Sequence, residues 1–122
     1  MGKESKDLGT SGEDAACQHL KNIGYKIIER NFRSQQGEID IIAKDGEFLV
    51  FIEVKNYSFR SYGSPLGAVR KSKKQSIIHA AQTYLYKNNI KNTNCRFDVL
   101  TIYRNHSGDA HIEYIKDAFY VN

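Results

Sequence analysis

The sequence predicts a single α/β domain built on one mixed β-sheet with a helix on either side, in the order αβββαββ. Two segments with apolar residues at helical spacing stand among five segments rich in β-branched and aromatic residues. An Asp-Gly pair between two apolar runs indicates a tight β-hairpin within the sheet. The length of 122 residues suits one domain with a single modest core.

The first helix follows a polar N-terminal stretch. Residues 1–9 are expected to form a flexible N-terminus, and residues 10–122 a single domain. The stretch TSGED contains two overlapping capping boxes, which predict that a helix begins at residues 10–14. The helix should run to about Asn22, because Gly24 can end it in the left-handed conformation.

Three β-segments come next along the chain. YKIIERNF is the first, and GEIDIIAK and EFLVFIEVK stand on either side of KDGE. Within KDGE, Asp45 and Gly46 are predicted to form a two-residue hairpin turn.

The second half of the chain holds the other helix and two more strands. NYSFRSYGS mixes glycine, serine, aromatic and basic residues without a period, and we expect a loop there. Pro65 suits the first turn of a helix that runs to about Lys87. RFDVLTIY and AHIEYI predict the last two strands. The apolar stripe of the second helix is Val69, Ile77, Ala80, Ala81, Tyr84 and Leu85.

The stretch FLVFIEVKN places charged side chains in a strand that needs burial. Glu53 and Lys55 follow five consecutive apolar residues, and only Val54 separates them. Such a pair on a strand is typical of a solvated sheet face with a surface salt bridge. Here acidic residues on the neighbouring β-segment also interrupt apolar runs, which favours a functional site. Both interpretations stay open at this point.

The predicted hairpin brings these charges together. With a two-residue Asp-Gly turn, Asp40 lies opposite Phe51 and Glu38 lies opposite Glu53. Alternate residues of a strand share a face, so Glu38, Asp40, Glu53 and Lys55 should all point one way. Asp40 and Glu53 are then diagonal neighbours, with Cα atoms about 7–8 Å apart.

Carboxylates this close suit a divalent cation. They repel one another and are costly to bury, and a bound cation removes both penalties. All-oxygen ligation favours Mg²⁺ or Mn²⁺ as the cofactor. Lys55, at the edge of the site, can hold or deprotonate an attacking water and stabilise the charge of the transition state. Together these groups predict metal-dependent hydrolysis of phosphodiester bonds.

Basic residues gather early in the second helix. The stretch VRKSKKQ supplies Arg70, Lys71, Lys73 and Lys74 as candidate contacts for nucleic-acid phosphates, and a solvated helix face is the alternative. Lys73 lies on the apolar line of the helix, so it either reaches toward the sheet face that bears Asp40 or extends to solvent.

The loop predicted after the EVK strand alternates aromatic and basic residues. Tyr57 and Arg60 are candidate contacts for unpaired bases or a distorted duplex. The same residues fit a local hydrophobic patch or a dimer interface, and the sequence favours none of the three.

The ordered set of acids and lysine is similar to the PD-(D/E)xK nuclease superfamily, which includes restriction endonucleases and archaeal Holliday-junction resolvases. More closely, the chain resembles the YraN-like family of small bacterial proteins, from about Gly12 to Phe119. The segments that carry this resemblance are GEDAACQHL, RNFRSQQGEIDIIAKDG, LVFIEVK, RFDVLTI and IKDAF. The resemblance implies a restriction-endonuclease-like three-layer fold and endonuclease activity.

The resemblance also implies roles for single residues. It assigns metal binding to Asp40 and Glu53, with the carbonyl of Val54 as a further ligand, and catalysis to Lys55. Glu13 corresponds to the helix-borne acid that completes or supports the metal site in the resolvases. A carboxylate in the first turn of a helix also caps it and answers its dipole, so both roles stay open for Glu13.

The predicted function is a metal-dependent endonuclease that acts on DNA, including branched or structured DNA. The preference for structured DNA comes from the resemblance to resolvases alone, and symmetric cutting of two strands would require a homodimer. One alternative is a module of the same fold that binds nucleic acid without cutting it. Another is an interaction protein whose basic helix meets an acidic partner.

Composition sets the remaining expectations. The formal net charge of +4 is small, so only its clustering bears on a polyanionic partner. No segment approaches the roughly 20 apolar residues of a membrane span, and the N-terminus has no apolar core of the kind found in secretory signals. We therefore expect a cytoplasmic protein.

Overall fold

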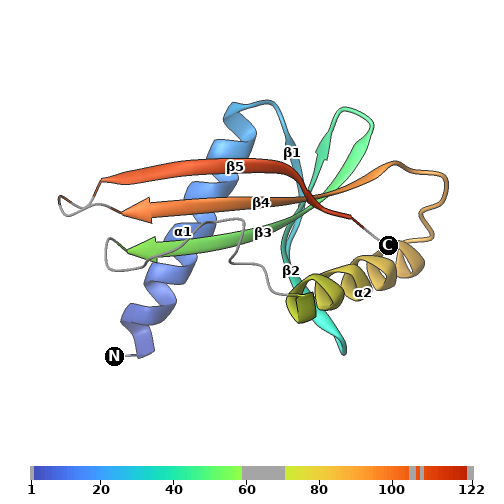
Figure 1. The fold of residues 1–122 in the computed structure, drawn as a ribbon, viewed down its shortest axis with the longest axis horizontal. Helices are drawn as coiled ribbons and strands as arrows, with labels where there is room; N and C mark the ends of the chain where they lie inside the picture. Colours follow the sequence, from blue (N-terminus) through green and yellow to red (C-terminus); the bar gives the residue numbers. More distant parts are fainter. Residues whose placement is uncertain (1, 59–70, 105–106, 108, 121–122) are drawn as a thin grey trace.

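The computed structural model describes residues 2–58, 71–104, 107 and 109–120, with the backbone alone at residues 2–11 and 58. Its helices and strands follow the predicted order αβββαββ (Figure 1). The elements are α1 (Gly2–Asn22), β1 (Lys26–Ser34), β2 (Gly37–Asp45), β3 (Phe48–Ser58), α2 (Lys71–Lys87), β4 (Cys95–Arg104) and β5 (Ala110–Phe119).

The strands form one mixed sheet in the order β1-β2-β3-β4-β5. β3 and β4 run parallel, and α2 lies in the crossover between them. The pairs β1–β2, β2–β3 and β4–β5 are antiparallel. The mixed sheet predicted from the sequence is therefore confirmed.

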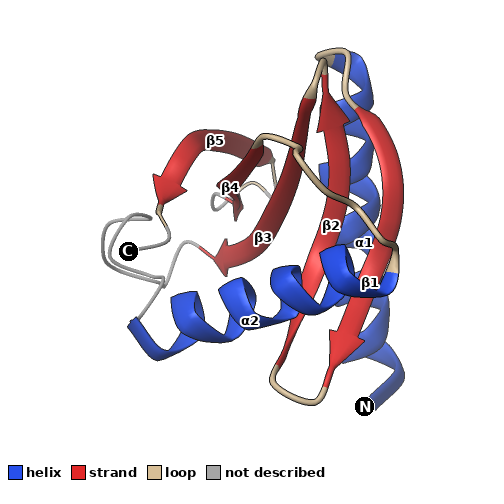
Figure 2. Cartoon of the chain, turned by 90° about the vertical axis from the view of Figure 1, so that its right-hand side faces the viewer, coloured by secondary structure: helices blue, strands red, loops and turns tan. Residues whose placement is uncertain are grey.

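The two helices cover opposite faces of the sheet, as Figure 2 shows with α1 behind the strands and α2 in front of them. Each helix builds one side of the core, which gives the three layers expected for the fold. The α1 side contains Ala16, Cys17, Leu20, Tyr25, Ile41, Ala43, Val50, Ile52, Leu100 and Ile102. The α2 side contains Phe32, Ile39, Ile42, Leu49, Phe51, Ile77, Ala80, Ala81, Tyr84, Phe97, Val99 and Phe119. Neither described helix is long and apolar enough to cross a membrane.

Helix α1 ends where the sequence predicts but begins earlier. It starts at Gly2 rather than at residues 10–14, because the preceding stretch contains no proline and several good helix formers. Its C-terminus is a Schellman motif: Gly24 has a φ of 96°, and the N–H of Tyr25 donates to the carbonyl of Leu20 at 2.9 Å. The flexibility expected for residues 1–9 stays a prediction.

The hairpin between β2 and β3 forms at KDGE, but its turn residues are Gly46 and Glu47. Asp45 pairs with Phe48 in the ladder instead of entering the turn. Gly46 has a φ of 61°, which suits glycine at the first central position of a type II′ turn. The predicted Asp-Gly turn is therefore wrong by one residue, because only glycine takes this positive φ without a Cβ penalty.

This turn changes the register between β2 and β3 by two residues. Phe51 pairs with Ile42, so its predicted pairing with Asp40 is wrong. The same register, continued along the strands, places Asp40 rather than Glu38 opposite Glu53. Because side chains alternate with a period of two, a shift of two residues leaves Asp40, Glu53 and Lys55 on their predicted face. Glu38 lies beyond the end of this ladder, where Ile39 packs with Ile42 on the α2 side.

Strand β3 extends further than expected. It runs to Ser58, so Tyr57 belongs to the strand and not to the loop predicted from residue 56. The reason is its pairing with β4, which continues in parallel register to the end of β3. The predicted start of the second helix at Pro65 and the stripe residue Val69 lie outside the described residues.

Gly37 sets the distance between the sheet and α2. A Cβ atom at this position would lie 2.5 Å from the backbone oxygen of Ser76 and 2.9 Å from its Cβ. Glycine therefore allows the start of β2 to contact the backbone of α2 directly. This approach matters for the site, because α2 carries Lys73 one turn before Ser76.

Candidate active site

Asp40 and Glu53, which we call the acid pair, meet where the ladder between β2 and β3 ends. One carboxylate oxygen of Asp40, Oδ2, accepts a hydrogen bond from the backbone N–H of Val54 at 2.8 Å. Glu53 is 5% exposed and lies in the middle of β3, next to fully buried Ile52. Glu53 thus has little access to water, and half-buried Asp40 lies within electrostatic range of it.

This environment alters the protonation of Asp40. Burial is the main cause that raises its pKa from 3.8 to about 7, and the negative charge of Glu53 adds to it. The hydrogen bond from Val54 opposes the shift, because it favours the charged carboxylate. The charge of Glu13 raises the pKa a little further, which places the α1 acid within electrostatic range of the acid pair.

Two lysines converge on the same oxygen of Glu53. The Nζ atom of Lys55 lies 3.3 Å from Oε1, and the Nζ atom of Lys73 lies 3.7 Å from it. Lys55 comes from the same strand two residues on, whereas Lys73 reaches the sheet from α2. Of the two alternatives for Lys73, the contact with the sheet face is confirmed.

Two buried polar atoms near these groups have no hydrogen-bond partner among the described residues. One is Oε2 of Glu53, and the other is Oγ1 of Thr101 on β4. Thr101 is the register partner of Lys55. Val99, two residues before Thr101 on β4 and so on the same face of the strand, belongs to the α2 side of the core. Thr101 therefore shares a face with Glu53 and Lys55. Buried oxygens without a partner are rare in proteins and usually accommodate water or an ion.

The acid pair fits a divalent cation. Its donors are oxygens, one of them has no described partner, and burial together with the charge of Glu53 raises the pKa of Asp40. In the described part of the chain, no group of three or more His, Cys, Asp or Glu side chains is arranged to hold a metal. Two carboxylates match the protein ligation usual for Mg²⁺, which keeps waters and substrate phosphates as its other ligands.

Glu13 is near the acid pair, but its carboxylate already has partners on β1. Its Oε2 accepts a hydrogen bond from Nδ2 of Asn31 at 3.0 Å and lies 3.4 Å from Nη2 of Arg30. Glu13 lies eleven residues after the first residue of α1, so the first-turn capping role is wrong. Its support of the metal site stays a prediction.

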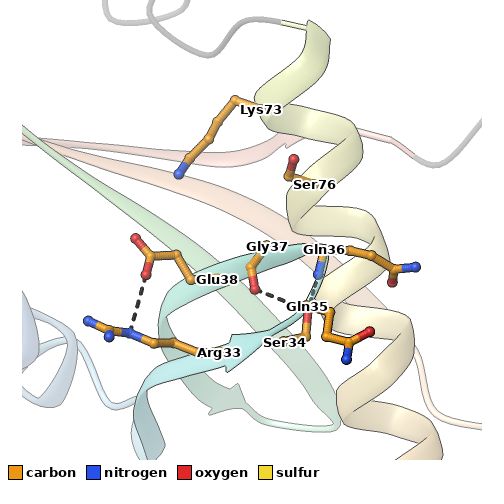
Figure 3. Close-up of a pocket in the computed structure, with 8 residues that line it drawn as sticks. All are labelled: Arg33, Ser34, Gln35, Gln36, Gly37, Glu38, Lys73 and Ser76. Atoms are coloured by element: carbon orange, nitrogen blue, oxygen red, sulfur yellow. Dashed lines mark hydrogen bonds and ion pairs between the residues drawn. The ribbon is translucent and has the colours of Figure 1, made fainter.

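A hollow of about 390 Å³ opens between the β1–β2 turn and α2, and Lys73 lines it (Figure 3). The amine of Lys73 points into it from α2, toward the carboxylate of Glu38 (Figure 3). Glu38 forms an exposed ion pair with Arg33, at 3.4 Å. The hollow gives a substrate an open approach to the lysine that contacts Glu53.

The other residues predicted to contact nucleic acid are spread over different parts of the surface. Tyr57 stacks on Tyr103 at the end of β3, with ring centroids 5.6 Å apart. By strand alternation it shares a face with Glu53 and Lys55. Lys71 and Lys74 line a separate hollow on α2 and do not contact the acid pair. Arg60 and Arg70 lie outside the described residues.

A second group of buried charges lies at the start of β4, and we call it the Arg96 network. Arg96 donates to both carboxylate oxygens of Asp98, to Asp45 at 2.9 Å and to the hydroxyl of Tyr25 at 2.7 Å. The hydroxyl of Tyr114 donates to Asp98 as well. These bonds raise the pKa of Arg96 against the effect of burial, and the bond from Arg96 lowers the pKa of Asp45. The RFDV motif is therefore structural.

Sequence reasoning missed four contributors to the site. Asn31 takes a positive φ of 56° beside the acid pair, a conformation that asparagine tolerates better than most residues. Gly12 packs against the side chain of Asn56, and a Cβ there would lie 2.3 Å from Nδ2. Gly37 and Thr101 are the other two. The glycines give a sequence signal as part of GED and GEID, whereas a single Thr in an apolar strand gives none.

Comparison with known proteins places this architecture in a family. Residues 12–102 match the family described as "Uncharacterised protein family UPF0102". The chain is similar to a UPF0102 protein of Clostridium kluyveri, with 45% identity over 118 residues that cover 96% of this chain and 97% of the relative. It is also 45% identical over 111 residues to a UPF0102 protein of Persephonella marina, covering 91% of each. A Clostridium botulinum UPF0102 protein is 46% identical over 119 residues, or 96% of this chain and 97% of the relative. The chain therefore belongs to UPF0102, the YraN-like family within the restriction-endonuclease-like superfamily.

Proposed function

We propose that this protein is a metal-dependent endonuclease that hydrolyses phosphodiester bonds in DNA. The observation that carries the proposal is the buried carboxylate of Glu53, with two lysines at one oxygen and no described partner at the other. A carboxylate kept buried and half-satisfied is unfavourable for folding alone, which favours a functional role.

Asp40 and Glu53 are the residues that would hold the cation, with the carbonyl of Val54 as a further ligand. Mg²⁺ and Mn²⁺ suit these oxygen donors. A bound cation would neutralise the negative charge that develops on the phosphoryl group during hydrolysis. Because the Val54 N–H fixes one oxygen of Asp40 at 2.8 Å, the acid is oriented before any ligand binds.

The lysines supply the positive charge next to the acids. In the proposal, Lys55 orients the attacking water and donates a hydrogen bond to the phosphoryl oxygen. Lys73 holds a phosphate that enters from the hollow beside α2. Glu13, whose charge reaches Asp40, supports the site from α1.

The substrate class follows from the resemblance to resolvases. We propose branched or structured DNA as a substrate and a homodimer as the form that would cut two strands symmetrically. The stacked pair of Tyr57 and Tyr103, on the same face as Lys55, offers an aromatic surface next to the cutting site.

One observation favours the non-catalytic alternative. Lys55 and Lys73 already neutralise Glu53 without a metal ion, so the site is electrostatically tolerable as it stands. In a pure binding module the acids would oppose the approach of phosphates. Neutralising Asp40 and Glu53 would then raise affinity for DNA, and metal would change little.

The test is cleavage of labelled linear, single-stranded, flap and four-way-junction DNA with Mg²⁺, Mn²⁺ or EDTA. Wild type should cut only when Mg²⁺ or Mn²⁺ is present, and not in EDTA. Glu53→Gln should abolish cutting, and Lys55→Ala should reduce it about 10²–10³-fold, as expected for loss of a charge-stabilising group. Matched controls are Glu47→Gln and Lys44→Ala, which change exposed residues of the same hairpin.

Two outcomes would contradict the proposal. Identical background from wild type and both site variants under every metal would remove the catalytic assignment. Metal-independent binding that tightens in Glu53→Gln, without cutting, would establish the binding module instead.

A further inference from the structure

The flank of α2 that faces away from the acid pair is strongly basic. No acidic residue occurs in α2, so its lysines have no carboxylate partner three or four residues away on the helix. Lys73 turns toward Glu53, but Lys71 and Lys74 do not. Within the described chain, neither of these two lysines lies within ion-pair distance of a carboxylate. No described ion pair uses their charge, although Nζ of Lys74 lies over the ring of Phe119, 6.0 Å from its centroid.

Lys71 and Lys74 line a second hollow, with a volume of about 580 Å³. This volume is within the range of pockets that enclose small ligands. Gln75, Gln82 and His79 add hydrogen-bonding groups to the same lining, and the described lining contains no acid. A hollow with cations and amides but no carboxylate is complementary to an anion.

Tyr120 adds an aromatic surface to this hollow. Its side chain is 70% exposed, which leaves the ring free of the core. A phenol ring beside lysines is the combination that binds unpaired nucleotides, since the ring stacks on a base and the cations contact the phosphates. A paired base in a duplex presents only its edges, so stacking on Tyr120 requires an unpaired one.

We propose that this hollow binds a single-stranded nucleic-acid segment, with Tyr120 stacked on a base and Lys71 and Lys74 contacting the phosphates. The inference rests on the proposed function in taking a nucleic acid as the ligand, and it deepens that function by specifying the strand. A substrate that reaches both flanks of α2 would carry an unpaired segment near the bond that is cut.

The experiment measures binding in EDTA, so that cleavage plays no part. Fluorescence anisotropy would compare single-stranded DNA, single-stranded RNA and duplex DNA of one sequence. Tyr120→Ala should weaken single-strand binding by several-fold to about 100-fold, and Tyr120→Phe should retain it. The double variant Lys71→Ala/Lys74→Ala should reduce the slope of log affinity against log salt by roughly 0.7 for each phosphate that a lysine no longer neutralises.

Matched controls come from the other end of the same helix. Tyr86 is 87% exposed and Lys87 is basic, so Tyr86→Ala and Lys87→Ala remove the same chemistry without touching the hollow. Both controls should bind as wild type does. Thermal unfolding of each variant would show that the fold is intact.

The inference is overturned if Tyr120→Ala and the double lysine variant bind single strands as tightly as wild type. It is also overturned if they lose duplex and single-strand binding equally, which would indicate a general phosphate surface. Cleavage by wild type together with unchanged binding in the variants would leave the nuclease proposal standing and remove this one. Single-strand binding that depends on the hollow, without cleavage by wild type, would support this inference and remove the nuclease proposal.

Discussion

The Arg96 network and the acid pair both place carboxylates inside the same sheet, but their surroundings differ. Asp98 is fully buried and accepts hydrogen bonds at both oxygens, from Arg96, Tyr114 and the backbone N–H of Asp117. Glu53 is nearly as buried, yet one of its oxygens has no described partner.

The difference separates a closed network of paired charges from a buried carboxylate that keeps one oxygen without a described partner. In the Arg96 network each buried charge has an oppositely charged partner within the protein. Removing one partner therefore leaves the other charge buried without compensation. In the acid pair two like charges face each other, and the protein raises the pKa of Asp40 instead of pairing it. A site of this kind is stabilised by what binds to it. The comparison predicts that equivalent substitutions in the two regions have effects of different size on folding.

The largest expected effect is on folding, from Asp98→Ala. The substitution leaves the buried guanidinium of Arg96 and the hydroxyl of Tyr114 without their main acceptor. We expect the free energy of unfolding to fall by about 3–5 kcal/mol, measured by urea denaturation. In contrast, Glu53→Gln should change stability far less, because relief of the repulsion with Asp40 offsets the loss of the ion pairs with Lys55 and Lys73.

Glu113→Ala, at an exposed position of β5, is the control for loss of an ordinary carboxylate and should change stability by less than about 0.5 kcal/mol. The comparison fails if Glu53→Gln destabilises the protein as much as Asp98→Ala does.

A smaller effect is expected from Gly37→Ala, which tests how the site is held together. The added Cβ meets the backbone of Ser76 at 2.5 Å, and a backbone cannot rotate away. We expect a loss of about 1–3 kcal/mol from overpacking, measured by thermal unfolding. Because α2 must shift, Lys73 should move from Glu53, and cleavage should fall with it.

Gly12→Ala is the matched glycine substitution. Its Cβ would meet the side chain of Asn56, which can move, and alanine is favoured over glycine within a helix. Stability should therefore change little. If Gly37→Ala is equally mild, the close contact of β2 with α2 is not what positions Lys73.

The last expected effect is the pH dependence that Asp40 confers. Because its pKa rises from 3.8 to about 7 on folding, the folded protein binds this proton more tightly. The free energy of unfolding should then fall as the pH rises from about 4 to about 7. Asp40→Asn removes the titration, so it should be more stable than wild type at pH 8, by at most about 4 kcal/mol for a shift of this size, and equal near pH 4.

Urea unfolding in EDTA at pH 4, 6 and 8 would measure this difference, with Glu47→Gln as an exposed control. An Asp40→Asn variant that is less stable than wild type at pH 8 would contradict the raised pKa. Adding Mg²⁺ should stabilise wild type at pH 8 and leave Asp40→Asn unaffected, since ligand binding to the folded state adds to its stability.

The sequence predicted well wherever a local pattern has a local cause. Alternating apolar runs gave the strands, the apolar stripe gave α2, and Gly24 marked the end of α1. The acids were recognisable because charges inside apolar runs are unfavourable without a use. Predictions failed where adjacent residues offer alternative turn or helix-start positions. The turn formed at Gly46 and Glu47, and the helix began before the capping signals at residues 10–14.

By itself, then, the sequence determined the order of elements, the mixed sheet and the face that carries Asp40 and Glu53. Only the tertiary structure decided that Lys73 reaches Glu53, that Thr101 faces the same site and that Arg96 and Asp98 form a closed network. Hydrophobic periodicity depends on residues close together in the sequence, and a register shift of two residues does not change which face each side chain occupies. Contacts between side chains far apart in the chain depend on how closely helices and strands approach, and that distance is set by packing at positions such as Gly37.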